Sequence, residues 1–220
     1  MTRFLLTATL LAALVSLTTA SGGSAQGPEC LGAPATITGS GTIVGTSGDD
    51  VIVGSPGPDV IVAQGGNDLV CGGQGNDIIL GGLGDDTLAG DDGVGGPTTP
   101  GGDDLIQGQD GNDELFGEGG NDTMRGGNGD DMVAGFNGDD DISGGNGDDF
   151  AVGGPQNDVV SGDNGNDAVF GAFGDDTVFL ERYLAAPRHI GREVADAPAR
   201  TSRATRRRDE DTITRRSDAY

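Results

Sequence analysis

Residues 72–91 read GGQGNDIILGGLGDDTLAGD, which is one nine-residue phrase written twice and followed by the start of a third copy. Each copy has glycine at positions one and four, aspartate or asparagine at position five, aspartate at position six and an aliphatic residue at position eight. Self-similarity at a fixed short period is typical of proteins built from stacked repeats. The extent of this phrase along the chain therefore decides which fold is expected.

The phrase occupies most of the chain. With the first frame set at Gly45, residues 45–179 divide into fifteen frames of nine residues without remainder. Glycine stands at position four in fourteen frames and at position one in thirteen, and position eight is Ile, Val, Leu or Met in thirteen. Position six is aspartate in fourteen frames, and these are the candidate metal ligands: Asp50, Asp59, Asp68, Asp77, Asp86, Asp104, Asp113, Asp122, Asp131, Asp140, Asp149, Asp158, Asp167 and Asp176.

One frame departs from the pattern. Residues 90–98, GDDGVGGPT, place Gly95 where aspartate belongs and Pro97 where the aliphatic residue belongs. Proline cannot donate a ladder hydrogen bond and fits the interior of a strand badly. We therefore predict a loop inserted into one turn, roughly residues 94–101. The alternative is a degenerate repeat.

The nine-residue period predicts a turn followed by a short strand. Glycine at positions one and four permits positive φ, and Asp or Asn at position five favours a turn. Positions seven to nine, such as IIL at 78–80, predict a three-residue strand whose middle side chain points to one face. If the strands alternate between two faces, two frames make one coil, and the eighth-position side chains meet in a thin core. The expected fold is all-β, a parallel β-roll or β-solenoid.

Negative charge dominates the repeats. Residues 45–179 contain 28 acidic residues and a single basic one, Arg125, in a chain whose formal net charge is −24. Nucleic acids and anionic membranes would be repelled by this segment, so neither is an expected partner. Low hydrophobicity with high net charge favours disorder unless something neutralises the charge. A cation is therefore the expected partner.

Calcium suits the frame better than other metals. Ca²⁺ takes six to eight oxygens from carboxylates and main-chain carbonyls in flexible geometry, whereas Mg²⁺ needs a strict octahedron and zinc prefers His or Cys. Stacked coils would bring the position-six aspartate of one frame toward that of the second frame along, with an ion between them. About ten Ca²⁺ ions would cancel most of the charge and drive folding.

The frames GGQGNDIIL (72–80) and GGNGDDMVA (126–134) match the pattern G-G-x-G-x-D-x-U-x at every fixed position. Over residues 45–179 the chain thus resembles the haemolysin-type calcium-binding proteins, which carry the repeats-in-toxin nonapeptide. The resemblance implies a parallel β-roll in which the first six residues of each frame bind calcium and the last three form a strand. It also implies that the fourteen position-six aspartates are the side-chain ligands.

The two ends of the chain differ from the repeats. The N-terminal stretch has the positive, apolar and small-residue regions of a secretory signal peptide, which predicts a secreted protein. We assign this signal to residues 1–25, cut after Ala20 or Ala25; the alternative, a membrane anchor, needs a longer apolar stretch. Residues 26–44 are predicted to form an N-terminal cap, and residues 180–220 a C-terminal cap and a disordered Arg-rich tail.

Export also permits a disulfide between the two cysteines, Cys30 and Cys71. It would tie the cap to the third repeat and close a loop worth about 4 kcal/mol in chain entropy. Two free thiols are the alternative. Because the chain has only one histidine, His189, in the distant tail, a zinc site built from these residues is not expected.

The sequence lacks the motifs of common catalytic sites. It contains no lysine, which excludes a phosphate-binding loop of the GxxxxGK type, and neither GxSxG nor HExxH occurs. Paired carboxylates such as Asp85 and Asp86 could serve a hydrolase, but their recurrence in so many frames favours ligands and turn formers. We predict a monomeric, secreted, non-enzymatic calcium-binding β-roll. The alternative is an adhesion or host-interaction module on the same solenoid, with a cell-surface or extracellular polymer as candidate partner.

Overall fold

The computed structural model describes residues 27–93, 101–179, 205–206 and 212–214. Within these residues the regular elements are all β-strands, and no helix is long and apolar enough to cross a membrane. The predicted signal peptide, residues 1–25, and most of the predicted tail lie outside the described residues.

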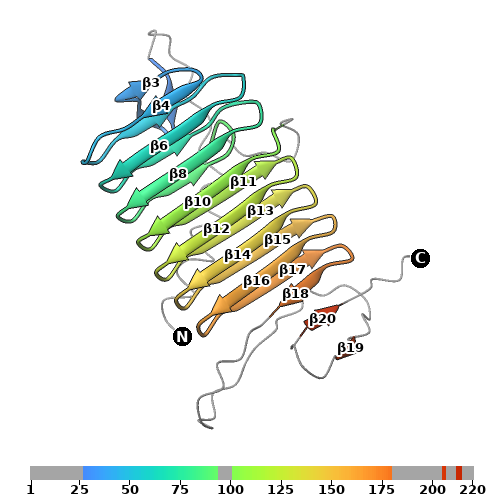
Figure 1. Ribbon diagram of the computed structural model, residues 1–220. Coiled ribbons are helices and arrows are strands. Elements are labelled where there is room, and N and C mark those ends of the chain that lie inside the picture. The colour runs from blue at the N-terminus through green and yellow to red at the C-terminus, as the bar shows by residue number, and fades with distance from the viewer. Residues whose placement is uncertain (1–26, 94–100, 180–204, 207–211, 215–220) are drawn as a thin grey trace.

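Two sheets of parallel strands form the two walls of a solenoid (Figure 1). The eight-stranded sheet contains β3 (Ile37–Thr38), β5 (Val51–Val53), β7 (Leu69–Cys71), β9 (Thr87–Ala89), β11 (Glu114–Gly119), β13 (Met132–Asn137), β15 (Phe150–Pro155) and β17 (Ala168–Phe173). The ten-stranded sheet contains β4 (Thr42–Val44), β6 (Val60–Gly65), β8 (Ile78–Leu83), β10 (Leu105–Asp110), β12 (Thr123–Asn128), β14 (Asp141–Asn146), β16 (Val159–Asn164) and β18 (Thr177–Phe179), followed by β20 (Thr212–Thr214) and β19 (Thr205–Arg206). The chain visits the two sheets alternately, so the prediction of a parallel β-roll is confirmed.

Strand register shows how many frames make a coil. Ile61 of β6 pairs with Ile79 of β8, and Met124 of β12 pairs with Ile142 of β14, so partners lie two frames apart. Between strands of residues 42–179 the same offset recurs along both sheets, with one exception, whereas β3, which precedes the repeats, pairs Ile37 with Ile52 of β5 at a shorter offset. Two nine-residue frames therefore make one coil, as the sequence predicts.

The exception lies beside the irregular frame. Ile79 of β8 pairs with Ile106 of β10, and Leu88 of β9 pairs with Leu115 of β11, so both partners lie three frames apart instead of two. One coil therefore contains nine more residues than its neighbours, and both sheets continue past it in register. Residues 94–100, which make up most of the predicted loop, lie outside the described residues.

The core is narrow because each frame contributes one side chain to it. The eighth-position residues are buried, and they form one continuous cluster: Ile43, Ile52, Ile61, Val70, Ile79, Leu88, Ile106, Leu115, Met124, Val133, Ile142, Ala151, Val160 and Val169, together with Ala63. Pleating sends the two flanking side chains of each strand to the outer face of the sheet. Hydrophobic burial is thus limited to little more than one aliphatic side chain per nine residues.

The strands are longer than the three residues predicted from the repeat. Ten strands have six residues and run from position seven of one frame to position three of the next: β6, β8 and β10 to β17. The ladder continues into the glycine-rich part because amides there also donate to the next coil. For example, Gly120 N donates to Asn137 O at 2.9 Å.

A short antiparallel hairpin, β1 (Glu29–Cys30) and β2 (Ala33–Pro34), precedes the first coil. The predicted disulfide joins Cys30 of this hairpin to Cys71 of β7, with a Cα–Cα distance of 5.6 Å. Both cysteines are buried, and Leu31, Val51, Val53 and Leu69 pack against them and Ala89. The hairpin therefore covers the outer face of β5, β7 and β9. At the other end of the solenoid, β18 pairs antiparallel with β20.

Reduction of this disulfide is expected to lower the stability of the calcium-loaded protein. The bond closes a loop with a sequence separation of 41 residues, and loop-closure entropy for this length is worth about 4 kcal/mol, of which about 2–4 kcal/mol is usually realised. The measurement is urea unfolding in saturating calcium with and without a reductant. The double variant Cys30→Ser/Cys71→Ser is the control, since reductant should not affect it. An unfolding midpoint that does not change on reduction would contradict the prediction.

Candidate metal centre

The fourteen candidate aspartates occupy two columns, one in each series of turns that joins the two sheets. One column contains Asp59, Asp77, Asp104, Asp122, Asp140, Asp158 and Asp176, and the other contains Asp50, Asp68, Asp86, Asp113, Asp131, Asp149 and Asp167. All are buried except Asp167, which is partly exposed. The repeat therefore places the charged residues of successive coils directly above one another and out of water.

Each column is joined by one repeated hydrogen bond. The backbone N–H of an aspartate donates to Oδ1 of the aspartate in the next coil, as in Asp104 N to Asp122 Oδ1 at 2.8 Å and Asp122 N to Asp140 Oδ1 at 2.8 Å. The same bond bridges the irregular frame, where Asp77 N donates to Asp104 Oδ1 at 2.7 Å. One oxygen of each of these carboxylates is thereby used to hold adjacent coils together.

The second carboxylate oxygen is left without a partner in most coils. Oδ2 is buried and accepts no hydrogen bond in Asp68, Asp77, Asp86, Asp104, Asp113, Asp122, Asp131, Asp140, Asp149 and Asp158. At the N-terminal end the same oxygen is satisfied, since Asp50 Oδ2 accepts from Thr46 N at 2.7 Å and Asp59 Oδ2 from Ser55 N at 2.6 Å. A buried charged oxygen without a partner is costly, so its recurrence in ten turns indicates that something else binds there.

First-position glycines leave space beside these oxygens. A Cβ on Gly117 would overlap Asp122 Oδ2 and lie 2.8 Å from the carbonyl oxygen of Gly135. A Cβ on Gly126 would meet Asp131 and the carbonyl of Gly144 in the same way. The sequence interpretation that glycine serves positive φ at position one is wrong, because these glycines lack positive φ. They are required by the close approach of oxygen atoms.

This arrangement fits a hard cation that accepts main-chain ligands. Several candidate positions, such as those beside Gly117 and Gly126, combine an unpartnered carboxylate oxygen with a carbonyl of the following coil, and calcium accepts both kinds of oxygen. Within the part of the chain that the structure describes, no point gathers three or more His, Cys, Asp or Glu side chains. A bound ion would therefore take much of its coordination from the backbone, which suits calcium and not zinc.

Burial changes the protonation of these carboxyls. Desolvation is the largest cause that raises each pKa; the amide hydrogen bond from the adjacent coil lowers it in part, and neighbouring carboxylates raise it further. The pKa reaches about 8 for Asp104, about 7 for Asp86, Asp122, Asp131, Asp149 and Asp158, and about 6 for Asp77, Asp113 and Asp140. Without a cation the folded chain therefore resists full ionisation at neutral pH.

The stability of the calcium-free fold should consequently fall with rising pH. These carboxyls have higher pKa values in the folded chain, about 6 to 8, than the ordinary value of 3.8. The folded state then binds more protons than the unfolded state, so stability is present below about pH 4 and is lost as pH rises toward about 8.

We expect the metal-free chain to show more β-structure at pH 5 than at pH 8 by circular dichroism. In saturating calcium the dependence should reverse, because calcium requires ionised carboxylates and releases protons on binding. A metal-free spectrum that is the same at both pH values would show that the buried carboxyls do not govern folding.

Two further acidic residues, which the repeat pattern did not single out, are also buried in the turns. Asp91 is 3% exposed and Glu118 is 7% exposed. Both stand at position two, where most frames have glycine or an exposed residue. Sequence reasoning missed Asp91 because the frame was read straight through the irregular residues. The sequence does contain evidence for this turn. Gly90 and Asp91 before the interruption fit positions one and two of a frame, and Gly102 and Asp104 after it fit positions four and six of the same frame.

Comparison with known proteins agrees with this geometry. The sequence model of the RTX calcium-binding nonapeptide repeat matches residues 44–79, 72–94, 101–133, 118–151, 134–168 and 143–178, which together cover more than half of the chain. The chain belongs to the RTX calcium-binding nonapeptide repeat family. The matched RTX segments include all fourteen candidate aspartates and leave out residues 95–100. A sequence comparison with curated proteins finds no match to this chain.

RTX repeats are calcium-binding elements, so calcium binding by this β-roll follows from membership of the family. The structure also shows where the buried carboxylate oxygens without hydrogen-bond partners lie. They lie in two columns on the turns, one carboxylate oxygen per coil in each column, over ten successive frames that carry the aspartate.

Proposed function

We propose that this protein is secreted, has no catalytic activity and uses Ca²⁺ ions, bound between successive coils, to drive its own folding. The observation that supports this proposal best is the set of ten buried Oδ2 atoms without hydrogen-bond partners. Each is an oxygen of a position-six aspartate, and all except Asp68 Oδ2 lie where the side chain of a first-position residue other than glycine would have to fit. The proposed ligands are the fourteen position-six aspartates together with main-chain carbonyls of the turns.

The same turns explain why calcium would act on the whole fold. In Asp122, for example, Oδ1 accepts the amide hydrogen of Asp104 in the preceding coil, while Oδ2 lies on the Gly117 side of the turn, where the carbonyl oxygen of Gly135 in the following coil also approaches. A cation at Oδ2 would therefore attach a carboxylate of one coil to the backbone of the next. Repeated in both columns, this link would replace the cohesion that the single row of core side chains does not supply.

Counting bound ions tests the proposal. We expect the purified chain, dialysed to equilibrium in millimolar calcium, to retain about ten Ca²⁺ ions per molecule, one for each unpartnered oxygen. Asp131→Asn should lose about one or two of these ions, because Asp131 is buried with Oδ2 unpartnered. Asp130→Asn makes the same charge change at an exposed neighbour and should retain them all. Equal ion counts for the two variants, or a wild-type chain that binds no calcium, would refute the proposal.

The proposal also includes secretion and the absence of catalysis. The N-terminal sequence supports export, and RTX repeat proteins are typically secreted. Intact mass of the protein recovered from culture medium should show loss of residues 1–20 or 1–25; retention of these residues would contradict export by a cleaved signal. An adhesion or host-interaction role stays a prediction, and the calcium-bound roll would be its scaffold.

A further inference from the structure

The irregular coil places one extra carboxylate inside a column. Gly90 begins this turn, since Gly90 N donates to Phe116 O at 2.9 Å, and a Cβ on Gly90 would overlap Asp104 Oδ2. The turn is then completed by Gly102 and Asp104, on the far side of the nine additional residues. Asp91 therefore occupies position two of the turn that carries Asp104.

Position two normally directs its side chain away from the column. In eleven other frames this residue has a left-handed backbone, with φ between 61° and 143°: Gln64, Gly73, Gly82, Gln109, Glu118, Gly127, Phe136, Gly145, Gly154, Asp163 and Ala172. Side chains such as Gln64, Gln109 and Ala172 are exposed as a result. Asp91 is not left-handed, and its side chain is 3% exposed. Among the described position-two residues, Asp91 alone combines a backbone outside the left-handed region with a buried side chain.

Asp91 lies among the turns of three successive coils. Its Oδ1 accepts from Gly102 N at 3.3 Å, and its Oδ2 accepts from Gly119 N at 3.2 Å in the next coil. A Cβ on Gly101 would overlap both Asp91 Oδ2 and the carbonyl oxygen of Gly119. Burial is the largest cause that raises the pKa of Asp77, Asp104 and Asp122, and the charge of Asp91 raises it further in all three, so Asp91 acts electrostatically on carboxyls of the preceding, the same and the following coil.

An independent observation points to a ligand at this place. Asp104 Oδ2 is buried and unpartnered, and it lies beside the position that a Gly90 side chain would take, 2.8 Å from the carbonyl oxygen of Gly117. Asp104 itself is 3% exposed. The oxygens available in this turn are therefore the usual carboxylate and carbonyl together with the carboxylate of Asp91.

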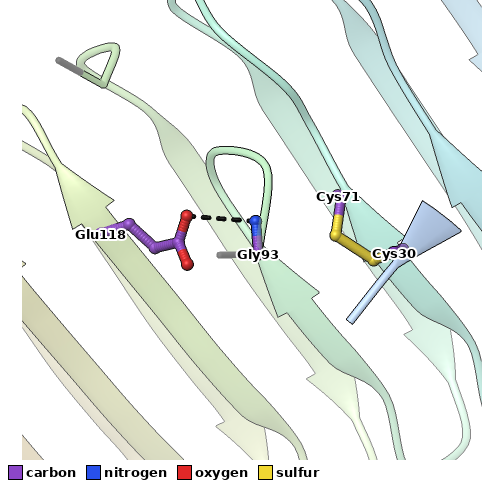
Figure 2. Close-up of a disulfide and its surroundings, with 4 residues drawn as sticks. All are labelled: Cys30, Cys71, Gly93 and Glu118. Carbon is purple, nitrogen blue, oxygen red and sulfur yellow. Dashed lines mark hydrogen bonds between the residues drawn. A yellow bond between two sulfur atoms is a disulfide. The ribbon is translucent and has the colours of Figure 1, made fainter. Parts of the chain in front are cut away.

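The segment that follows Asp91 passes between Glu118 and the disulfide at Gly93 (Figure 2). Gly93 N donates to Glu118 Oε2 at 3.2 Å. On its other side, a Cβ on Gly93 would lie 2.8 Å from Cys71 Sγ, a member of the disulfide, and 3.0 Å from Leu31. A carboxylate held in place before the ion arrives loses less entropy on binding.

We propose that Asp91 supplies a second carboxylate to the calcium position beside Asp104, and that this makes it the tightest calcium site of the solenoid. The inference rests on the proposed function, since it assumes calcium at the Oδ2 positions. Calcium affinity rises with the number of charged ligands and with the rigidity of the site. Each turn offers its position-six carboxylate, and this turn adds the buried carboxylate of Asp91. The buried carboxylate of Glu118, at position two of the following coil, accepts from Gly93 N instead.

Calorimetric calcium titration of the full chain tests the proposal with two neighbouring variants. Wild type should show one site per molecule that is tighter than the rest, and Asp91→Asn should weaken that site about tenfold. Asp92→Asn removes the same charge from the adjacent exposed residue, which acts on Asp91 through its charge at a distance, and it should weaken the tight site much less than Asp91→Asn does. Equal tight-site affinities in both variants would overturn the role of Asp91, whereas a wild-type chain that binds no calcium would overturn the proposed function itself.

Folding of the Asp91→Asn variant gives a second measurement. If this variant unfolds at calcium concentrations that fold Asp92→Asn, the site proposal requires that about tenfold more calcium restores its β-structure. Failure to fold at any calcium concentration would instead show that Asp91 acts through its hydrogen bonds to Gly102 and Gly119. That outcome would also overturn the proposal.

Discussion

At neutral pH, the calcium-free chain without residues 1–25 is expected to give the circular dichroism spectrum of an unfolded polypeptide, and calcium is expected to convert it into a β-rich protein. The physical reason lies in the columns of aspartates. Ten buried oxygens have no hydrogen-bond partner, and each ionised carboxylate repels its neighbours in the same column. A core with little more than one aliphatic side chain per frame cannot offset the free-energy cost of these unpaired oxygens and of the repulsion between carboxylates.

Calcium titration measures this transition directly. The midpoint is expected between about 0.1 and 1 mM, the range of extracellular calcium modules. Magnesium at the same concentrations is the control, and it should not fold the chain, because carbonyls from two coils do not provide the strict octahedron that it requires. A chain that shows the full β spectrum in EDTA, or folds equally well in magnesium, would exclude calcium as the source of cohesion.

A single methyl group at one turn glycine is expected to have the second large effect. Gly129 stands at position four with φ +135°, and a Cβ there would overlap the carbonyl oxygen of Gly111 in the preceding coil. Gly129→Ala should therefore both strain the backbone and force two coils apart. We expect the calcium-loaded fold to lose about 3 kcal/mol or more of its free energy of unfolding, measured by urea denaturation in saturating calcium.

The matched control for this change is Gly48→Ala. Gly48 also stands at position four, but no atom lies within 4 Å of its Cβ position, and it lacks positive φ. The same substitution should therefore change stability by less than about 1 kcal/mol, and it would stabilise slightly through the unfolded state. If both variants lost a similar amount of free energy of unfolding, the close approach of successive coils at Gly129 would not be the cause of the destabilisation.

Much of this fold can be predicted from the sequence because the repeat is nearly perfect. A period of nine with one aliphatic residue per frame predicts two frames per coil, and the pairing of Ile61 with Ile79 confirms it. The pairing of Cys30 with Cys71 could be proposed because the chain contains only these two cysteines. In such cases one local rule, repeated many times, decides the structure.

What could not be predicted depends on contacts between coils. The length of the strands follows from amide bonds such as Gly120 N to Asn137 O, which no single frame reveals. The need for glycine at position one arises from oxygens of two different coils, as at Gly117, and not from its own φ. Asp91 was missed because its buried position depends on residues that follow the interruption. The position-six aspartates as calcium ligands stay a prediction, which the unpartnered oxygens support.

The hydrogen bonds between the position-six aspartates all run in one direction. Asp104 donates its amide to Asp122, and Asp122 donates to Asp140, so the acceptor always belongs to the coil that follows in the sequence. A polypeptide that emerges from a membrane with its N-terminus first thus delivers each position-six donor before its acceptor, whereas at position five the acceptor comes first, as in the bond from Asp148 N to Asp130 Oδ1. Each position-six bond can form only after the next eighteen residues have emerged. The solenoid would therefore grow in one direction, and its most recently formed coil would always lack this bond.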